Sequence, residues 1–259
     1  MNTCDLIGRL FLIGGRAMSC LADFVSLAGG VESDIVVLPH ASSVPAEVAS
    51  EMVATLRGMG VTKVRAVMPG EVLDLKGVDA VYMLGGDQSN LVDRLGAEGV
   101  AELRRAFSAG VLVAGSSAGA ACVGEYMISG GMTDGSTDAS TLESRSGLGL
   151  LFGLVVDTHF AERSRFARPG AVINRAVQEG YGLPSALGLD EDTAAYIEIR
   201  KGKAARIKVF GEGKVWAYVP KGRAVARVTE RRRKARVVVE HSYAAGECFK
   251  LKGIKVSFR

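Results

Sequence analysis

A serine flanked by glycines follows an apolar run in the middle of the chain. Residues 111–114 are apolar, Ser117 occupies the centre of a Gly-x-Ser-x-Gly pattern, and residues that permit a helix follow from Ala120 to Met127. A strand, a tight turn and a helix would expose the serine hydroxyl at the apex of the turn. The N–H of Ala118 would then point toward the group that the serine attacks. The pattern alone also fits a serine without catalytic function in an ordinary α/β protein.

Polar residues follow three more apolar runs. Residues 78–84 lead into Gly85-Gly-Asp-Gln88, residues 155–156 lead into Asp157-Thr-His-Phe160, and residues 187–189 lead into Asp190-Glu-Asp192. Arginines 163, 165 and 168 come directly after the histidine. Each group also has a structural explanation: a helix N-cap, a structural histidine, a solvated helix start, and acids that cap a neighbouring element or lie in solvent. The residues alone leave both explanations open.

The elements that must position these groups alternate along the chain. Apolar runs at Arg9–Gly15, Asp34–Leu38, Lys63–Val67 and Val78–Leu84 predict strands. Apolar residues at helical spacing predict a helix over Pro45–Gly60 and one or two helices over Leu91–Phe107. This alternation predicts a parallel sheet with helices on both faces. In such sheets, chemistry collects at the carboxyl ends of the strands, where each polar group above is expected.

Composition narrows the class of protein. The chain has 259 residues, 48% of them hydrophobic, which predicts a globular protein with a sizeable core. No uninterrupted apolar run reaches 18 residues, so no membrane span is expected. The four cysteines and three histidines show no disulfide or metal-ligand spacing. We therefore expect no metal and no cofactor, and a reducing, cytoplasmic setting.

The last quarter of the chain differs from the rest in charge and in pattern. Residues 200–259 hold 18 Lys and Arg against 4 Asp and Glu, although the whole chain has a net charge of only +4. Short alternating or β-branched runs predict strands at residues 196–199, 205–210, 215–219, 224–228, 237–240 and 254–258. We interpret 195–259 as a basic, β-rich extension of a single domain spanning 1–259. Its Arg231–Lys234 cluster would attract a polyanion, or only keep an exposed sheet edge in solvent.

Taken in order, the motifs resemble the cyanophycinase and aspartyl dipeptidase (peptidase E) family of serine peptidases, and most closely its cyanophycinase branch. The resemblance rests on Gly85–Gln88, Gly115–Ala120, Asp157–Arg168 and Gly188–Ala194 and runs from about residue 10 to 195. It implies a flavodoxin-like fold, with three layers around a parallel sheet. It also implies a homodimer.

The resemblance assigns roles residue by residue. Ser117 would be the nucleophile, His159 the general base and then acid, and Glu191 the residue that orients the imidazole. The N–H groups of Gly86 and Ala118 would bind the oxyanion. The residues that would bind an aspartyl substrate are Gln88, Asp157, Arg165 and Arg168.

The implied activity is exopeptidase hydrolysis of aspartyl bonds through an acyl-enzyme, with an aspartyl peptide or an Asp/Arg polymer as substrate. The alternatives are an aspartyl dipeptidase acting on short peptides with N-terminal aspartate, and a non-catalytic flavodoxin-like protein that binds an anionic partner. A nucleic-acid partner is not favoured. Thr158 and Asp192 stand where the cyanophycinase pattern has glutamine and asparagine. Both departures are expected to touch the substrate pocket and to affect the choice of substrate.

Overall fold

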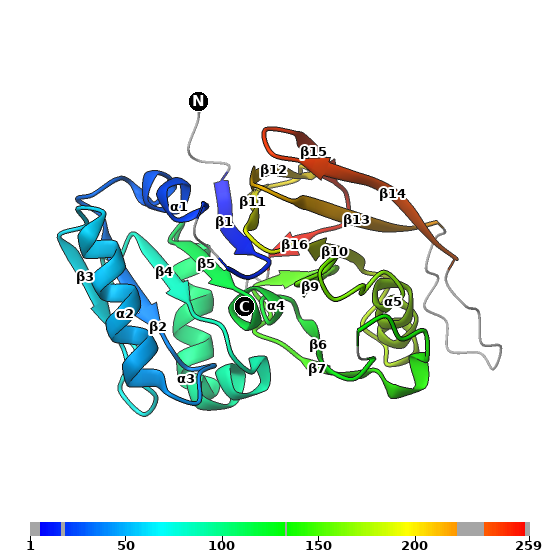
Figure 1. Cartoon of the computed structure of the whole chain (residues 1–259), viewed down its shortest axis with the longest axis horizontal. Coiled ribbons are helices and arrows are strands. Elements are labelled where there is room, and N and C mark those ends of the chain that lie inside the picture. Colours follow the sequence, from blue (N-terminus) through cyan, green and yellow to red (C-terminus); the bar gives the residue numbers. More distant parts are fainter. Residues whose placement is uncertain (1–5, 17–18, 133, 222–235, 257–259) are drawn as a thin grey trace.

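The computed structural model describes residues 6–16, 19–132, 134–221 and 236–256. Its larger sheet has the strand order β15-β12-β11-β1-β5-β4-β2-β3 (Figure 1). Neighbouring strands from β1 to β3 in this order are parallel. The strands predicted before residue 90 are confirmed to within a few residues, and they are β1 (Leu6–Ile13), β2 (Asp34–Leu38), β3 (Lys63–Ala66) and β4 (Ala80–Met83).

Helices cover both faces of this sheet, as predicted. Along β1, Leu10 and Leu12 belong to one hydrophobic core, and Phe11 and Ile13 belong to the other. Helices α1 (Leu21–Ala28) and α2 (Pro45–Gly58) pack on the Phe11 side, and α3 (Gln88–Ser108) packs on the Leu10 side. Because each strand is buried on both faces, its sequence is a continuous apolar run instead of an alternating one. The predicted α/β class is confirmed.

A second sheet carries the histidine and acid motifs. Its order is β14 (Arg236–Ala244), β13 (Lys214–Lys221), β10 (Ser185–Leu189) and β9 (Leu154–Thr158), with β9 and β10 parallel. Helix α5 (Arg168–Gln178) packs against it through Val172 and Ile173. The expected single parallel sheet is therefore split in two. The edge of β1 that β9 or β10 would need is occupied by β11 (Thr193–Arg200), which runs antiparallel to β1.

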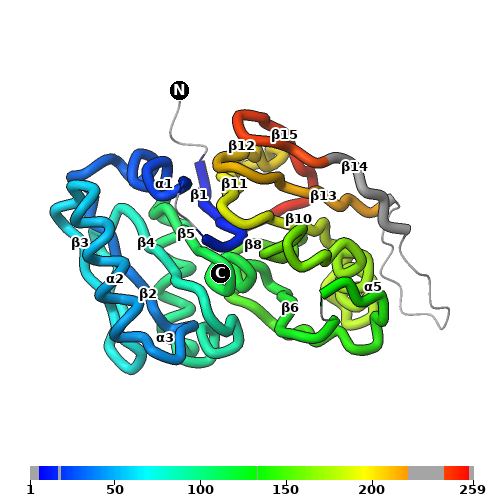
Figure 2. The backbone as a smooth tube through the Cα atoms, in the orientation of Figure 1, coloured from blue at the N-terminus to red at the C-terminus, as the bar shows by residue number. Residues whose placement is uncertain are grey.

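Strands from the C-terminal region take part in both sheets. Strand β11 pairs with β1 and is followed outward by β12 (Ala205–Gly211) and β15 (Cys248–Leu251). The tube in Figure 2 shows β11 and β12 beside β1, from the beginning of the chain. Strands β13 and β14 join the second sheet instead. The predicted strand at 224–228 and the Arg231–Lys234 cluster lie outside the described residues.

The helix expected over Ala120–Met127 is wrong. Helix α4 spans only Ala118–Ala121, and β6 (Tyr126–Gly130) follows, paired with β7 (Glu143–Ser146). The carbonyls of Cys122 and Val123 accept hydrogen bonds from the N–H groups of Leu148 and Leu150, at 2.7 and 2.9 Å. A distant segment thus takes the acceptors that a continuing helix would need. A 3-10 helix (Ala139–Thr141) and the pair β8 (Leu151–Phe152) and β16 (Lys255–Val256) complete the structure.

Helix α3 consists of two helical segments that meet at Gly96. This glycine has φ 63° and ψ −178°, a conformation that is almost confined to glycine. The alternative of one or two helices, left open by the sequence, is thus resolved as two segments with a kink. Within the described part of the chain, no helix is long and apolar enough to cross a membrane.

The kink predicts a stability difference between two glycine substitutions. Gly96→Ala should destabilise the fold by on the order of 1–3 kcal/mol, because alanine is strained at this φ and ψ. Gly58→Ala, in α2, is the control: its φ is not positive, and a Cβ there would meet nothing within 4 Å. It should be neutral or stabilising by up to about 1 kcal/mol. Thermal unfolding checks both, and equal melting temperatures for the two variants would contradict the strain.

Candidate active site

Ser117 lies at a strained turn between β5 (Leu112–Ser116) and α4. Its φ of 52° is in the left-handed region, and its N–H donates to the carbonyl of Ile13 on β1 at 2.9 Å. A Cβ on Gly115 would overlap the backbone of Gly119, and one on Gly119 would overlap the carbonyl of Met83 on β4. The two flanking glycines are therefore required by close packing. This agrees with the reason that the sequence suggested for them.

Ser117, His159 and Glu191 form a hydrogen-bonded chain. The Ser117 Oγ lies 2.8 Å from His159 Nε2, and His159 Nδ1 lies 2.7 Å from Glu191 Oε1. When Nδ1 carries the proton that binds the carboxylate, Nε2 is left as an acceptor for the serine hydroxyl. Ser117 comes from the large sheet, whereas His159 and Glu191 follow strands β9 and β10 of the second sheet. The chain thus joins residues at the carboxyl ends of three strands.

The Gly14–Gly15 turn after β1 fixes the histidine and the acidic turn. Gly14 O accepts from the N–H of His159 at 2.8 Å, and Gly15 O accepts from the N–H of Asp192 at 2.7 Å. Gly15 has φ 130°, and a Cβ on it would overlap the imidazole ring. From the sequence, this pair of glycines was predicted only as a turn ending the first strand. Its role in the site was missed, because the contacting residues lie more than 140 positions away.

Asp190 holds the acidic turn from the other side. Its Oδ1 accepts from Ala161 N and Trp216 Nε1, both at 3.0 Å, and its Oδ2 accepts from Lys214 N at 3.0 Å. Burial raises the pKa of this carboxyl, while the hydrogen bonds from Ala161, Trp216 and Lys214 act in the opposite direction. These donors come from the segment after β9 and from β13. Asp190 therefore caps two neighbouring backbones and does not sit in solvent.

The glycine turn after β4 lies next to the serine. A Cβ on Gly85 would be 3.3 Å from the Ser117 Cβ, and the N–H of Asp87 donates to the carbonyl of Ala41 at 2.9 Å. Asp87 is the N-cap of α3, since its side chain accepts from Ser89 N and Asn90 N. The structural explanation for Asp87 therefore holds. Gly86 itself lines the pocket beside Ser117.

A pocket of about 330 Å³ opens beside Ser117 and His159. Gln88 lines it but also donates through Nε2 to the carbonyl of Ile128 at 2.8 Å, which fixes β6 against α3. Thr158 lines it as expected, whereas Asp192 is not among the lining residues. The Asp192 carboxylate instead accepts from Ser19 N at 2.8 Å. The expectation that Asp192 touches the pocket is not met in this structure.

One wall of the pocket is charged. Arg165 Nη1 and Arg168 Nε lie 3.1 and 3.2 Å from the two oxygens of Asp157, and Arg165 Nη1 also donates to the carbonyl of Thr158 at 2.8 Å. Burial raises the pKa of Asp157, against the opposing effect of the two guanidinium groups, and burial lowers the pKa of Arg168. The structure brings these residues, which the resemblance assigned to substrate binding, to one pocket. The sequence did not indicate that Asp157 would pair with both arginines.

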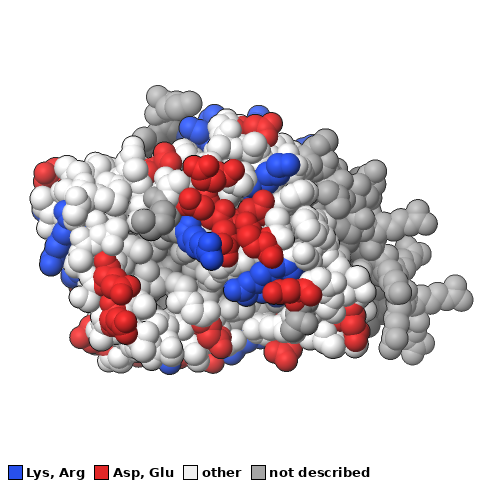
Figure 3. Space-filling model, viewed as in Figure 1, with Lys and Arg blue, Asp and Glu red and all other residues white. Residues whose placement is uncertain are grey.

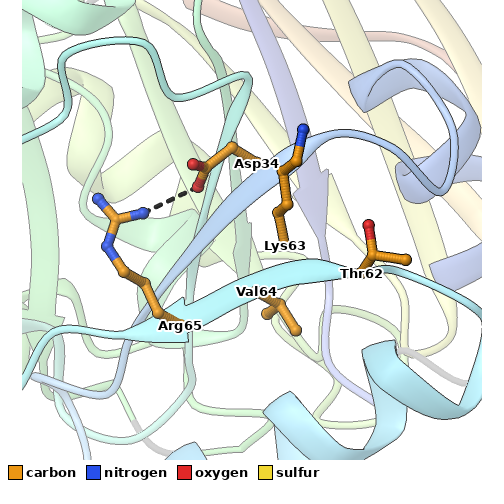
Figure 4. Close-up of a pocket in the computed structure, with 5 residues that line it drawn as sticks. All are labelled: Asp34, Thr62, Lys63, Val64 and Arg65. Atoms are coloured by element: carbon orange, nitrogen blue, oxygen red, sulfur yellow. Dashed lines mark hydrogen bonds and ion pairs between the residues drawn. The ribbon is translucent and has the colours of Figure 1, made fainter.

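Charged side chains gather over this part of the molecule. Figure 3 shows acidic and basic groups side by side near the middle of the face, over the region where β1 and β10 end in Figure 1. A different hollow of about 260 Å³ is lined by Asp34 and residues 62–65 (Figure 4). It lies where β2 and β3 begin, at the other edge of the sheet from Ser117. It holds an ion pair between Arg65 and Asp34, 2.8 Å apart, and no serine–histidine pair. Among the described residues, no group of three His, Cys, Asp or Glu could hold a metal ion.

A serine hydrogen-bonded to a histidine, which is in turn hydrogen-bonded to a carboxylate, beside a substrate-sized pocket, is the arrangement of a serine-type hydrolase. The comparisons with known proteins agree with this class. The model of Peptidase family S51 matches residues 10–207, so the chain belongs to peptidase family S51. It is a serine-type exopeptidase.

Curated relatives support the family, and two solved structures share the fold. Cyanophycinase from Geminocystis herdmanii is 33% identical over 81% of this chain and 80% of its own length. Cyanophycinase from Trichormus variabilis is 31% identical over 80% of this chain and 72% of its own. The crystal structure of a peptidase from an acI-B1 Actinobacterium covers 95% of this chain and 98% of its own, with a TM-score of 0.62 and 19% identity. The crystal structure of a putative peptidase E from Listeria monocytogenes covers 79% of this chain and 98% of its own, with a TM-score of 0.51 and 18% identity.

We predict that Gly15→Ala lowers the peptidase rate strongly while the protein still folds. The new Cβ would displace the His159 ring, and a shift of about 1 Å in a reacting group costs on the order of a hundredfold. Gly30→Ala is the control, because Gly30 also has a positive φ but a Cβ there would meet nothing within 4 Å. Peptidase rates and circular dichroism of both variants check this. Equal activity in the two variants would contradict it.

Proposed function

We propose that this protein hydrolyses aspartyl peptide bonds with Ser117 as nucleophile, His159 as general base and acid, and Glu191 as the orienting acid. The observation that carries the proposal is the Ser117–His159–Glu191 hydrogen-bonded chain at the mouth of a pocket walled by arginines. The aspartyl peptide or Asp/Arg polymer substrate follows from the resemblance to cyanophycinases. A cytoplasmic setting is supported by the buried free thiols of Cys20 and Cys122. A homodimer remains a prediction of the resemblance.

In the first half of the reaction, Ser117 Oγ attacks the scissile carbonyl carbon as His159 Nε2 takes the hydroxyl proton. The carbonyl oxygen becomes an oxyanion, which the N–H groups of Gly86 and Ala118 would bind. The imidazolium then gives its proton to the leaving amine nitrogen as the C–N bond breaks, and an ester to Ser117 remains. In the second half, water loses a proton to His159, attacks the ester and releases the acid, and Ser117 recovers its proton. Glu191 stabilises the imidazolium in both halves.

The arginine wall supports an anionic group on the substrate. Two aspartates (Asp134 and Asp157) and three arginines (Arg163, Arg165 and Arg168) line the pocket, so the formal charges of these five side chains sum to +1. A guanidinium has five N–H donors, and the contacts of Arg165 and Arg168 with Asp157 use only some of them. The Nε atoms of both arginines are buried, so the Nη groups would be the donors that meet a substrate carboxylate. Asp157 would then hold both guanidinium groups in place instead of contacting the substrate directly.

If Ser117 is the nucleophile, alanine substitutions at Ser117 and at the adjacent Ser116 should differ greatly in turnover. Ser117→Ala should lower turnover by about 10⁶-fold with little change in folding, as for other nucleophiles that act with a base and an acid. Ser116→Ala, at the last residue of β5, should retain activity within a few-fold. Turnover of an aspartyl peptide and labelling by a serine-directed fluorophosphonate check both variants. The assignment fails if the Ser117 variant keeps more than a few per cent of the parent rate.

The arginine wall predicts discrimination between aspartyl and asparaginyl substrates. An amide would leave guanidinium donors in the pocket without an anionic partner, which costs several kcal/mol. We expect the specificity constant kcat/KM to be at least about a hundredfold lower for the asparaginyl peptide. Comparable values for the pair would remove the arginines from substrate binding.

The same assay decides between the two substrate classes. Thr158 is shorter than the glutamine of the cyanophycinase pattern and leaves room in the pocket, so short aspartyl peptides should be cleaved measurably. Cleavage of the Asp/Arg polymer with none of short aspartyl peptides would instead assign the protein to the cyanophycinase activity alone. Cleavage of short peptides alone would favour the dipeptidase.

A further inference from the structure

Glu191 has a second partner besides the histidine. Its Oε1 faces His159 Nδ1 at 2.7 Å, and its Oε2 lies 3.0 Å from the Nε of Arg16. Among the described residues, Arg16 is the one arginine or lysine paired with Glu191. The Glu191 side chain is only 19% exposed, whereas that of Arg16 is 80% exposed. The guanidinium therefore covers the solvent side of the carboxylate.

The backbone around Arg16 is fixed to the acidic turn. Gly15, directly before it, accepts from the N–H of Asp192, and Ser19, shortly after it, donates to the Asp192 carboxylate at 2.8 Å. Arg16 itself has φ 44°, in the left-handed region that most side chains avoid. In this strained conformation, the Arg16 side chain reaches the Glu191 carboxylate. The pair is thus built on a short segment held to the same turn on both sides of Arg16.

The surroundings of Glu191 are otherwise acidic. Its own N–H donates to the Glu162 carboxylate at 3.1 Å, and Asp190 and Asp192 flank it in the chain. Without Arg16, the bond to His159 alone would leave the carboxylate freer to rotate. Binding Oε2 leaves Oε1 as the acceptor for His159 Nδ1 and fixes the plane of the carboxylate.

We propose that Arg16 is a positioning residue, which holds Glu191 so that one carboxylate oxygen stays aimed at His159. It acts through Glu191 and touches neither the substrate nor the reacting atoms. This inference rests on the proposed function, because it assigns Arg16 a task within the Ser117–His159–Glu191 chain. It concerns a residue that none of the sequence motifs included.

The experiment compares Arg16→Met, Arg16→Lys and Arg16→Gln with a matched control, Arg105→Met. Arg105 also pairs with a carboxylate that is 19% exposed, that of Glu102, but on the distant surface of α3. Two rates are measured for each protein: labelling of Ser117 by a fluorophosphonate, which needs no substrate, and turnover of an aspartyl peptide with kcat and KM separated. Melting temperatures report folding.

Arg16→Met should lower the labelling rate and kcat by about two- to fivefold, the range expected for an exposed ion pair, with KM unchanged within twofold. Arg16→Lys and Arg16→Gln should recover part of the loss, because both can still donate to Oε2. In about 1 M salt, the parent rate should move only part of the way toward that of Arg16→Met, because salt weakens the exposed ion pair but leaves its hydrogen bond. Arg105→Met should match the parent throughout.

The proposal is overturned if Arg16→Met equals or exceeds the parent rate, or if its loss lies in KM. A faster variant would mean that the guanidinium acts mainly by repelling the imidazolium. If one variant folds poorly, the lysine and glutamine variants still test the same bond. Failure of the proposed function is separate: it would show as unchanged labelling or turnover in Ser117→Ala. A labelled, active parent with an unaffected Arg16→Met would reject only the role of Arg16.

Discussion

Three backbone hydrogen bonds at the end of β1 set the geometry on which the site depends. Ile13 O accepts from Ser117 N, Gly14 O from His159 N, and Gly15 O from Asp192 N. Each such bond contributes only about 0.5–1.5 kcal/mol net, so the bonds do not by themselves hold the two sheets together. Their effect is to position the serine turn, the histidine and the acidic turn against the same buried stretch of backbone. Side chains at positions 14 and 15 would break this arrangement, which is why glycine is needed there.

The local sequence predicted which segments form strands and which polar residues follow them. Apolar runs identified β1 to β4 and placed the serine, histidine and acidic motifs at strand ends, whereas the family resemblance singled out Ser117, His159 and Glu191 among them. The division into two sheets was not predictable in this way, because an apolar run does not specify its pairing partner. The helix expected after Ala120 failed for a related reason, since the segment around Leu148 takes its carbonyls. The pairing of Asp157 with two arginines likewise depends on packing that only the folded chain provides.

Buried and exposed charges have different tasks in this molecule. Asp157 and Asp190 are both buried, and burial raises the pKa of each carboxyl, so their partners must compensate for lost hydration. Asp190 accepts hydrogen bonds from N–H donors and links the end of β10 to β13. Asp157 is surrounded by guanidinium groups, which it orders while leaving the pocket positively charged. The exposed pair of Arg65 with Asp34 lies away from the site and contributes little to stability.

The pairing of β1 with β11 has a consequence for how the protein is made. Ile13 pairs with Ala194, and Leu10 with Ile197, so β1 leaves the ribosome well before β11, its partner at this edge, which lies more than 180 residues later in the chain. Contacts between such distant segments form slowly, because a long loop must be closed before they yield any stabilisation. Until then, a strongly apolar strand has an open edge that another chain could join. Glu191 is synthesised just before β11, so the growing chain gains the carboxylate of the Ser117–His159–Glu191 chain and the cover for β1 at nearly the same moment.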